Sequence, residues 1–189
     1  MINERYSLRT RLLHWLTAAI VLWALVFGLI IAVIPRQLAF LQNLAELNVS
    51  LTSTLIPFFV LRCINTLCER RPTEIANSRL QRQIKRGVHF ILYATTLTAL
   101  VSGVLMMDRP INVFGLVEIP NLLDTSRNLN PFHCIHRFSS AVLAVAVCLH
   151  IGAVIHHHRC GNHVMTRMSL RWRRRLDTQQ SRARSRVRV

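Results

Sequence analysis

The chain has 189 residues, of which 51% are hydrophobic, and its 24 basic and 8 acidic residues give a formal net charge of +16 at pH 7. The charges stand in blocks between long apolar runs, which is the pattern of a small integral membrane protein. The sequence contains no internal repeat and its five cysteines lack zinc-binding spacing, which excludes a repeat architecture and a zinc module.

The first predicted membrane-spanning helix covers residues 12–34, which are apolar apart from His14 and Thr17. About twenty-three residues are enough to cross about 30 Å of hydrocarbon with some tilt. The segment starts close to the N-terminus and runs long without a small-residue cleavage site. We therefore interpret it as a permanent helix and not as a secretory signal.

The remaining predicted spans cover residues 44–67, 90–107 and 139–155. The second span is the least apolar, because Asn48, Pro57 and Arg62 interrupt it. The third contains no charged residue and directly follows His89. The fourth is also free of charge, which favours a membrane span over a core helix of a soluble domain.

These spans predict an all-α fold, an integral membrane four-helix bundle in up-down-up-down order over residues 1–168. The connections are too short for a separate soluble domain. Residues 169–189 form an arginine-rich tail, and since few apolar residues follow Leu176, we expect the tail to be disordered.

The basic residues predict the orientation of the bundle. They gather before the first span, between the second and third spans, and after the fourth: Arg5, Arg9, Arg11, Arg70, Arg71, Arg79, Arg82, Lys85, Arg86 and ten arginines after His158. The positive-inside rule then places both termini and the middle connection in the cytoplasm. Arginines beside a membrane also attract anionic lipid headgroups, so we expect such lipids, and no nucleic acid, as partners of the tail.

This orientation assigns a depth to three histidines. His14 lies near the cytoplasmic face, and since the fourth helix runs inward, His136 is outer and His150 is inner. The last two are fourteen residues apart, close to four helical turns, so they share a face at a separation of about 21 Å. An ionisable side chain inside an apolar span is by default a sign of function.

His14 and His150 share a depth on two different helices. Two imidazoles so placed can supply both axial ligands of a haem iron, which leaves no open coordination site and favours electron transfer over oxygen chemistry. The alternative, an interfacial histidine bonded to a neighbour or to lipid, is the simpler interpretation of either residue alone. The matched depth favours the haem.

A series of short motifs runs from about Glu4 to Met168. They are Glu-Arg-Tyr followed by His14-Trp15-Leu16, Arg62, His89, Gly103-Val-Leu-Met-Met107, Arg109-Pro-Ile-Asn-Val-Phe-Gly115, His136, His150 and the His156 to His158 cluster. In these motifs the chain resembles the bacterial cytochrome b561 family, which shares its domain with the cytochrome b subunits of nickel-iron hydrogenases.

The resemblance implies a four-helix bundle in the bacterial inner (cytoplasmic) membrane with two b-type haems that exchange electrons with ubiquinone or another quinone. Some members resemble superoxide oxidases, so an oxidoreductase activity of that kind is one expectation; the redox donor is open. By resemblance, His14 and His150 hold the inner haem and His136 the outer one. His89 is left for a haem propionate or the quinone region.

Arg62 fits the same picture, because a buried cation needs an anionic partner and haem propionates are candidates. The alternative is that its side chain snorkels toward the inner surface. His156 to His158 point in different directions on a helix, so we interpret them as a cytoplasmic cap and not as a metal site.

The chain departs from the family at Asn48, which stands fourteen residues before Arg62, where the family places the outer-haem histidine of the second helix. An amide is a poor ligand for haem iron. One haem b is therefore expected at the inner site, while the outer haem is absent, five-coordinate or ligated from elsewhere. Two alternative functions stay open: a haem-containing anchor subunit of a redox enzyme, and a scaffold that has lost one or both haems.

Overall fold

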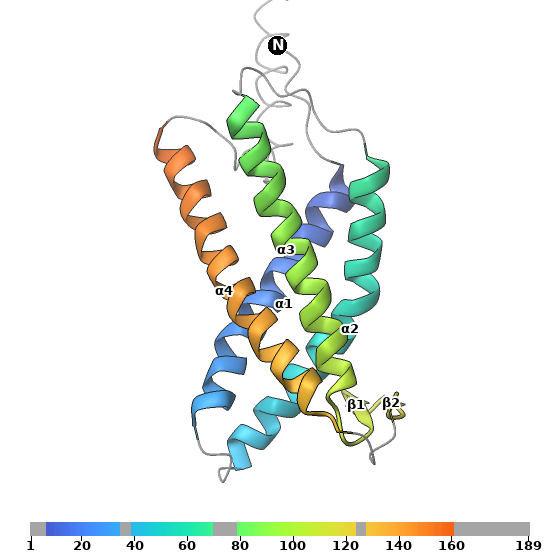
Figure 1. Ribbon diagram of the computed structural model, residues 1–189. Coiled ribbons are helices and arrows are strands. Elements are labelled where there is room, and N and C mark those ends of the chain that lie inside the picture. The colour runs from blue at the N-terminus through green and yellow to red at the C-terminus, as the bar shows by residue number, and fades with distance from the viewer. Residues whose placement is uncertain (1–6, 35–38, 70–78, 124–127, 161–189) are drawn as a thin grey trace, which may run out of the picture.

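The computed structural model describes residues 7–34, 39–69, 79–123 and 128–160. Its elements are α1 (Leu8–Val33), α2 (Ala39–Cys68), α3 (Arg79–Leu105), β1 (Ile111–Val113), β2 (Val117–Ile119) and α4 (Asn130–Arg159) (Figure 1). Each of the four helices is long and apolar enough to cross a membrane, which confirms the four predicted spans. The predicted tail, residues 169–189, lies outside the described residues.

The helices continue past the apolar runs that predicted them. The difference is greatest for α3, which starts at Arg79 and not at the first uncharged residue of its span. A helix keeps its backbone hydrogen bonds when it leaves the hydrocarbon. The apolar run therefore gives the length of the membrane-spanning part, and the helix itself can extend beyond it. The start of α4 fits its sequence, because Pro131 stands in the first turn, where its missing N–H costs no hydrogen bond.

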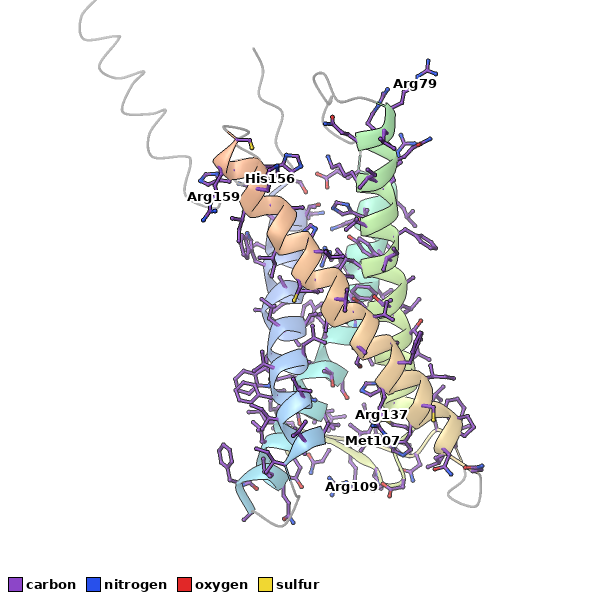
Figure 2. The ribbon with its side chains drawn as sticks, turned by 60° about the vertical axis from the view of Figure 1, so that its left-hand side comes forward. Arg79, Met107, Arg109, Arg137, His156 and Arg159 are labelled. Carbon is purple, nitrogen blue, oxygen red and sulfur yellow. The ribbon has the colours of Figure 1, made fainter. Side chains whose placement is uncertain are left out.

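The start of α1 and the start of α3 lie at one end of the bundle together with the ends of α2 and α4 (Figure 1). We call this the Arg62 end, after the arginine late in α2, and the opposite end the hairpin end, because it carries β1 and β2. Figure 2 labels Arg79, His156 and Arg159 at the Arg62 end, and Met107, Arg109 and Arg137 at the hairpin end.

The helices pack as two pairs. α1 lies along α2 and α3 lies along α4, while approach between the two pairs is much sparser and occurs between α2 and α3. The buried apolar side chains are few, with Leu55 and Phe59 of α2 among the most enclosed. Most large apolar side chains are exposed, as expected for helices that face lipid, where packing between helices relies on small and weakly polar residues.

A short hairpin departs from the all-α prediction. Phe114 and Gly115 adopt positive φ values of 54° and 72°, which is the backbone of the tight turn that suits the twist of two antiparallel strands. Ser50 of α2 anchors the hairpin: its hydroxyl donates to the carbonyl of Asn112 at 3.0 Å and accepts from the amide of Phe114 at 3.3 Å. Strands of three residues carry too little periodicity to be predicted from sequence.

Glu69 joins the end of α2 to the start of α1. Its carboxylate accepts the backbone N–H of Ser7 at 2.8 Å and the hydroxyl of Thr10. Partial burial acts to raise the pKa of Glu69, but the hydrogen bonds from Thr10 and Ser7 outweigh it and hold the pKa below its ordinary value. A carboxylate at a helix N-terminus also faces the positive end of the helix dipole.

Replacing Glu69 with glutamine is expected to destabilise the protein by about 0.3–1 kcal/mol at neutral pH, because the charge at the α1 N-terminus is lost. The pKa of Glu69 is lower in the folded protein than in the unfolded chain. The stabilisation that ionised Glu69 gives to the wild-type fold is therefore complete above pH about 4.5, and it disappears as the pH falls through the lowered pKa. Thermal unfolding in detergent between pH 3 and 7 measures it. Glu46→Gln, in an exposed pair with Arg109, is the control; an equal pH effect in both variants contradicts the assignment.

Candidate functional site

Side chains from all four helices meet at the Arg62 end: His14 of α1, Arg62 of α2, His89 and Tyr93 of α3, and His150 of α4. Arg62 is the centre of this cluster. Its Nη2 lies 3.1 Å from Nδ1 of His14 and its Nε donates to the hydroxyl of Tyr93 at 3.1 Å. The guanidinium carbon also lies 5.0 Å from the centroid of the Tyr93 ring.

Among the described residues, the bonded partners of Arg62 are the side chains of His14 and Tyr93, and its pairing with a haem propionate stays a prediction. Tyr93 itself is held by Thr66, one helical turn after Arg62, at 2.9 Å between the two oxygens. Sequence reasoning missed Tyr93. A signal existed, because Tyr93 follows His89 by four residues and so lies on the same face of α3.

The two predicted inner histidines contact different members of the cluster. The rings of His89 and His150 are 5.6 Å apart at their centroids and meet edge to face. His14 belongs to the same end of the bundle through its contact with Arg62. His89 is exposed and its Nδ1 donates to the carbonyl of Lys85 at 2.7 Å. The structure thus brings together every residue that the sequence assigned to the inner site.

The hydrogen bond to Arg62 determines which nitrogen of His14 carries the proton. A guanidinium only donates, so Nδ1 of His14 accepts and the ring proton sits on Nε2. Iron ligation through Nε2 requires the opposite tautomer, with the proton on Nδ1. Arg62 must then release Nδ1, which frees two of its N–H groups for an anion. The residues at this end therefore fit a haem once one side chain turns.

The third predicted ligand, His136, lies nearer the hairpin end. Its Nδ1 is 2.9 Å from the carbonyl oxygen of Ala99 on α3 and 3.4 Å from the hydroxyl of Ser102. A carbonyl only accepts, so Nδ1 carries the proton and Nε2 is the nitrogen able to bind iron. Beside the ring stands Gly103, where a side-chain Cβ would lie 3.2 Å from Cε1 of the imidazole.

Asn48 is the residue expected from the sequence to stand in place of an outer haem ligand. Its Oδ1 is buried, and no hydrogen-bond donor among the described residues reaches it. Thr52, one turn later, does not serve as that donor because its hydroxyl bonds to the backbone carbonyls of Asn48 and Val49. A buried acceptor without a partner is costly, and in native proteins it usually marks a bound group or a functional role.

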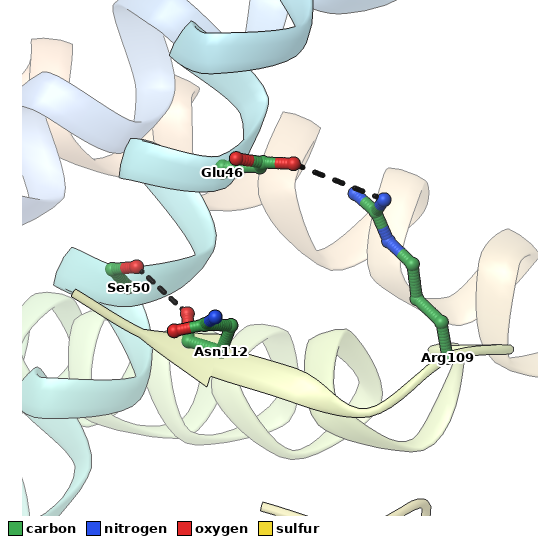
Figure 3. A network of polar contacts seen from close by, with 4 residues as sticks. All are labelled: Glu46, Ser50, Arg109 and Asn112. Atoms are coloured by element: carbon green, nitrogen blue, oxygen red, sulfur yellow. Dashed lines mark hydrogen bonds and ion pairs between the residues drawn. The ribbon is translucent and has the colours of Figure 1, made fainter. Parts of the chain in front are cut away.

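Polar contacts at the hairpin end connect α2 to the segment around β1 (Figure 3). Arg109 pairs with Glu46 at 3.9 Å, and Ser50 bonds to Asn112. Both charged side chains are more than half exposed, so their pairing contributes little stability. A shallow cavity of about 110 Å³ is lined by Glu46, Arg109 and Asn112 together with Val49, Met107, Pro110 and Ile111. It is too small and too open to hold a cofactor.

The arrangement as a whole suits flat cofactors held between the helix pairs. α1 and α4 are not one of the closely packed helix pairs, and a histidine of each helix belongs to the cluster at the Arg62 end. Nearer the hairpin end, the His136 ring packs closely against Gly103, where a side chain would crowd it. The donor set, imidazole nitrogens from separate helices, is the set that holds haem iron in helix bundles.

Comparisons with known proteins agree with this chemistry. Residues 5–169, which include all four helices and the side chains at both ends of the bundle, match the protein family described as prokaryotic cytochrome b561. Cytochrome b561 homolog 2 of Escherichia coli (strain K12) is 25% identical over 160 residues, covering 82% of this chain and 85% of that protein. No solved structure matches the chain significantly.

Proposed function

This chain belongs to the prokaryotic cytochrome b561 family, and from that premise we propose that it carries electrons between the quinone pool and a redox partner in the bacterial cytoplasmic membrane. Membership itself makes the protein a multi-pass membrane cytochrome with b-type haem and a role in electron transfer. The proposal adds the site, a haem at the Arg62 end ligated by His14 and His150.

The observation that carries the proposal is the cluster at the Arg62 end, which includes His14 of α1 through its contact with Arg62 and His150 of α4 through its contact with His89. A haem between two imidazoles supplies reversible one-electron chemistry and has no open coordination site. This favours a carrier over an oxygen-activating enzyme.

Arg62 then binds a propionate. When its Nη2 leaves His14, the Nε bond to Tyr93 can stay, so the guanidinium turns about an existing anchor. The planar fork of arginine suits a carboxylate better than the ring nitrogen it leaves. Tyr93 and Thr66 thus position Arg62, and Arg62 in turn orients the cofactor.

We place the quinone contact beside His89. Its side chain is exposed at the Arg62 end, while its ring touches that of His150. The imidazole of His89 can donate a hydrogen bond to a quinone carbonyl at the membrane surface. The quinone would then lie close to His150, the proposed haem ligand. The family resemblance also suggests superoxide as the electron donor. Electrons from superoxide would have to enter the protein at the hairpin end, on the opposite face of the membrane. This route therefore needs a second redox centre about 21 Å away, the helical distance from His150 to His136.

We propose that the Arg62 end faces the cytoplasm, because the described basic residues concentrate there: Arg9, Arg11, Arg79, Arg82, Lys85, Arg86 and Arg159. The hairpin end mixes Arg109 and Arg137 with acidic residues. A reporter that is active only in the periplasm is expected to be silent when fused after Leu176 and active when inserted at Asn121. The reverse pattern contradicts the orientation and exchanges the inner and outer sites.

The proposed function is tested by quinol oxidation. Stopped-flow mixing of the oxidised protein with a short-chain ubiquinol is expected to reduce the haem, and His89→Ala is expected to slow this several-fold while the haem spectrum stays unchanged. Cys148→Ala, an exposed position on α4, is the control and should behave as wild type. A fully loaded haem that ubiquinol does not reduce and ubiquinone does not oxidise contradicts the proposal.

A further inference from the structure

Arg62, Tyr93 and Thr66 form a closed ring of hydrogen bonds between α2 and α3. The Nε–H of Arg62 donates to the hydroxyl oxygen of Tyr93 at 3.1 Å, and the hydroxyl oxygens of Tyr93 and Thr66 are 2.9 Å apart. The hydroxyl of Thr66 donates to the backbone carbonyl of Arg62 at 2.9 Å. The ring therefore begins at the side chain of Arg62 and ends at the backbone of the same residue.

The protons of this ring can point in only one order. A guanidinium only donates, and a hydroxyl group has a single proton. Because the proton of Thr66 points to the carbonyl of Arg62, the proton of Tyr93 points to the oxygen of Thr66. The phenol of Tyr93 thus has no proton free for a cofactor, and its contribution is to hold Arg62.

Aromatic packing also holds Arg62 in place. The ring of Tyr93 lies 5.8 Å from the ring of Phe59 between centroids, and Phe59 is one of the most enclosed side chains of α2. The guanidinium carbon of Arg62 lies 5.0 Å from the centroid of the Tyr93 ring, inside the range of about 6 Å in which an aromatic face attracts a cation. Tyr93 therefore anchors Arg62 through a hydrogen bond and through the face of its ring.

The anchored charge lies beside His14. Nη2 of Arg62 is 3.1 Å from Nδ1 of His14, the proposed axial ligand. Neither His14 nor Tyr93 carries a negative charge that would cancel the charge of the guanidinium. Reduction adds an electron to a haem, so a fixed positive charge near an axial ligand stabilises the reduced form, and more strongly where the dielectric constant is low.

We propose that Tyr93 and Thr66 are positioning residues that fix the charge of Arg62 and thereby raise the reduction potential of the haem ligated by His14. The inference rests on the proposed function and deepens it. When Nη2 of Arg62 turns from His14 to a propionate, the bond from Nε to Tyr93 keeps the guanidinium beside the haem. Arg62 then offsets the negative charge of the propionate, which acts on the potential in the same direction.

The test is a potentiometric titration of the full-length, haem-loaded protein in detergent, followed through the reduced-minus-oxidised spectrum of the low-spin haem. Tyr93→Phe keeps the aromatic face and removes only the hydroxyl, so it should shift the midpoint potential to a lower value with the haem content unchanged. Thr66→Val breaks the same ring and should shift the potential in the same direction. The double variant should shift it no further than the larger single shift, because the two residues act as one unit.

Thr66→Ser is the conservative variant, because it keeps the hydroxyl, and it should have the wild-type potential. Thr98→Val is the matched control on α3. Thr98 is exposed and its hydroxyl donates to the carbonyl of Ala94 in its own helix, so its replacement should leave the potential unchanged. Arg62→Gln removes the charge itself and should give the largest shift to lower potential.

An unchanged or raised potential in both Tyr93→Phe and Thr66→Val overturns the inference, and so does an equal shift in Thr66→Ser or Thr98→Val. If Arg62→Gln fails to bind haem, the two ring variants still decide, because they keep Arg62. A low-spin haem that requires neither His14 nor His150 contradicts the proposed function instead. The two failures are therefore distinguishable.

Discussion

His14→Ala and His150→Ala are each expected to abolish the same low-spin haem. The two side chains come from α1 and α4 and belong to the cluster at the Arg62 end, and low-spin ligation needs a strong axial ligand on both sides of the iron. Loss of either histidine leaves at best a weakly held haem whose iron has five ligands. The reduced-minus-oxidised spectrum and the haem content of the purified protein measure the effect, and the double variant should lose no more than either single variant.

His157→Ala is the matched control, because His157 is exposed beyond the cluster on the same helix as His150. It should keep the full low-spin spectrum. His89 offers a sharper comparison, since its ring also touches His150. If His89→Ala removes the low-spin haem and His14→Ala does not, then α3 and not α1 supplies the second ligand, and the assignment is wrong.

Gly103→Leu is expected to produce the second largest effect. A Cβ at this position would lie 3.2 Å from Cε1 and 3.3 Å from Nδ1 of His136, so a larger side chain must push the ring away from the Ala99 carbonyl. Overpacking of this kind typically costs about 1–3 kcal/mol. The displaced imidazole would also lose its orientation toward iron, so the haem held by His136 should be lost together with stability.

Gly152→Leu is the control for this variant. Gly152 lies on α4, and a Cβ at this position would have no neighbouring atom within 4 Å. Leucine is also a better helix former than glycine by about 0.5–1 kcal/mol. Thermal unfolding in detergent should therefore show no loss for Gly152→Leu and a clear loss for Gly103→Leu. Equal stability of the two variants would show that α3 and α4 do not approach closely at Gly103.

The sequence alone determined the number of membrane helices, since a span needs only a continuous apolar run of sufficient length, and apolarity is a local property. It also indicated the cofactor class, because His14, His136 and His150 are ionisable residues in apolar surroundings at related depths. Family membership confirms the haem. The helix bounds were less predictable, because α3 and α4 continue into polar segments that hydropathy does not distinguish from loops.

Only the tertiary structure decided which side chains meet. The sequence did not predict that Arg62 of α2 contacts His14 of α1 and Tyr93 of α3. It did not predict the bond from Ala99 that orients His136, nor the buried Oδ1 of Asn48. Hydropathy records how deep a residue lies in the membrane, but the rotation and tilt of each helix determine what that residue contacts, and these depend on packing between segments far apart in the chain.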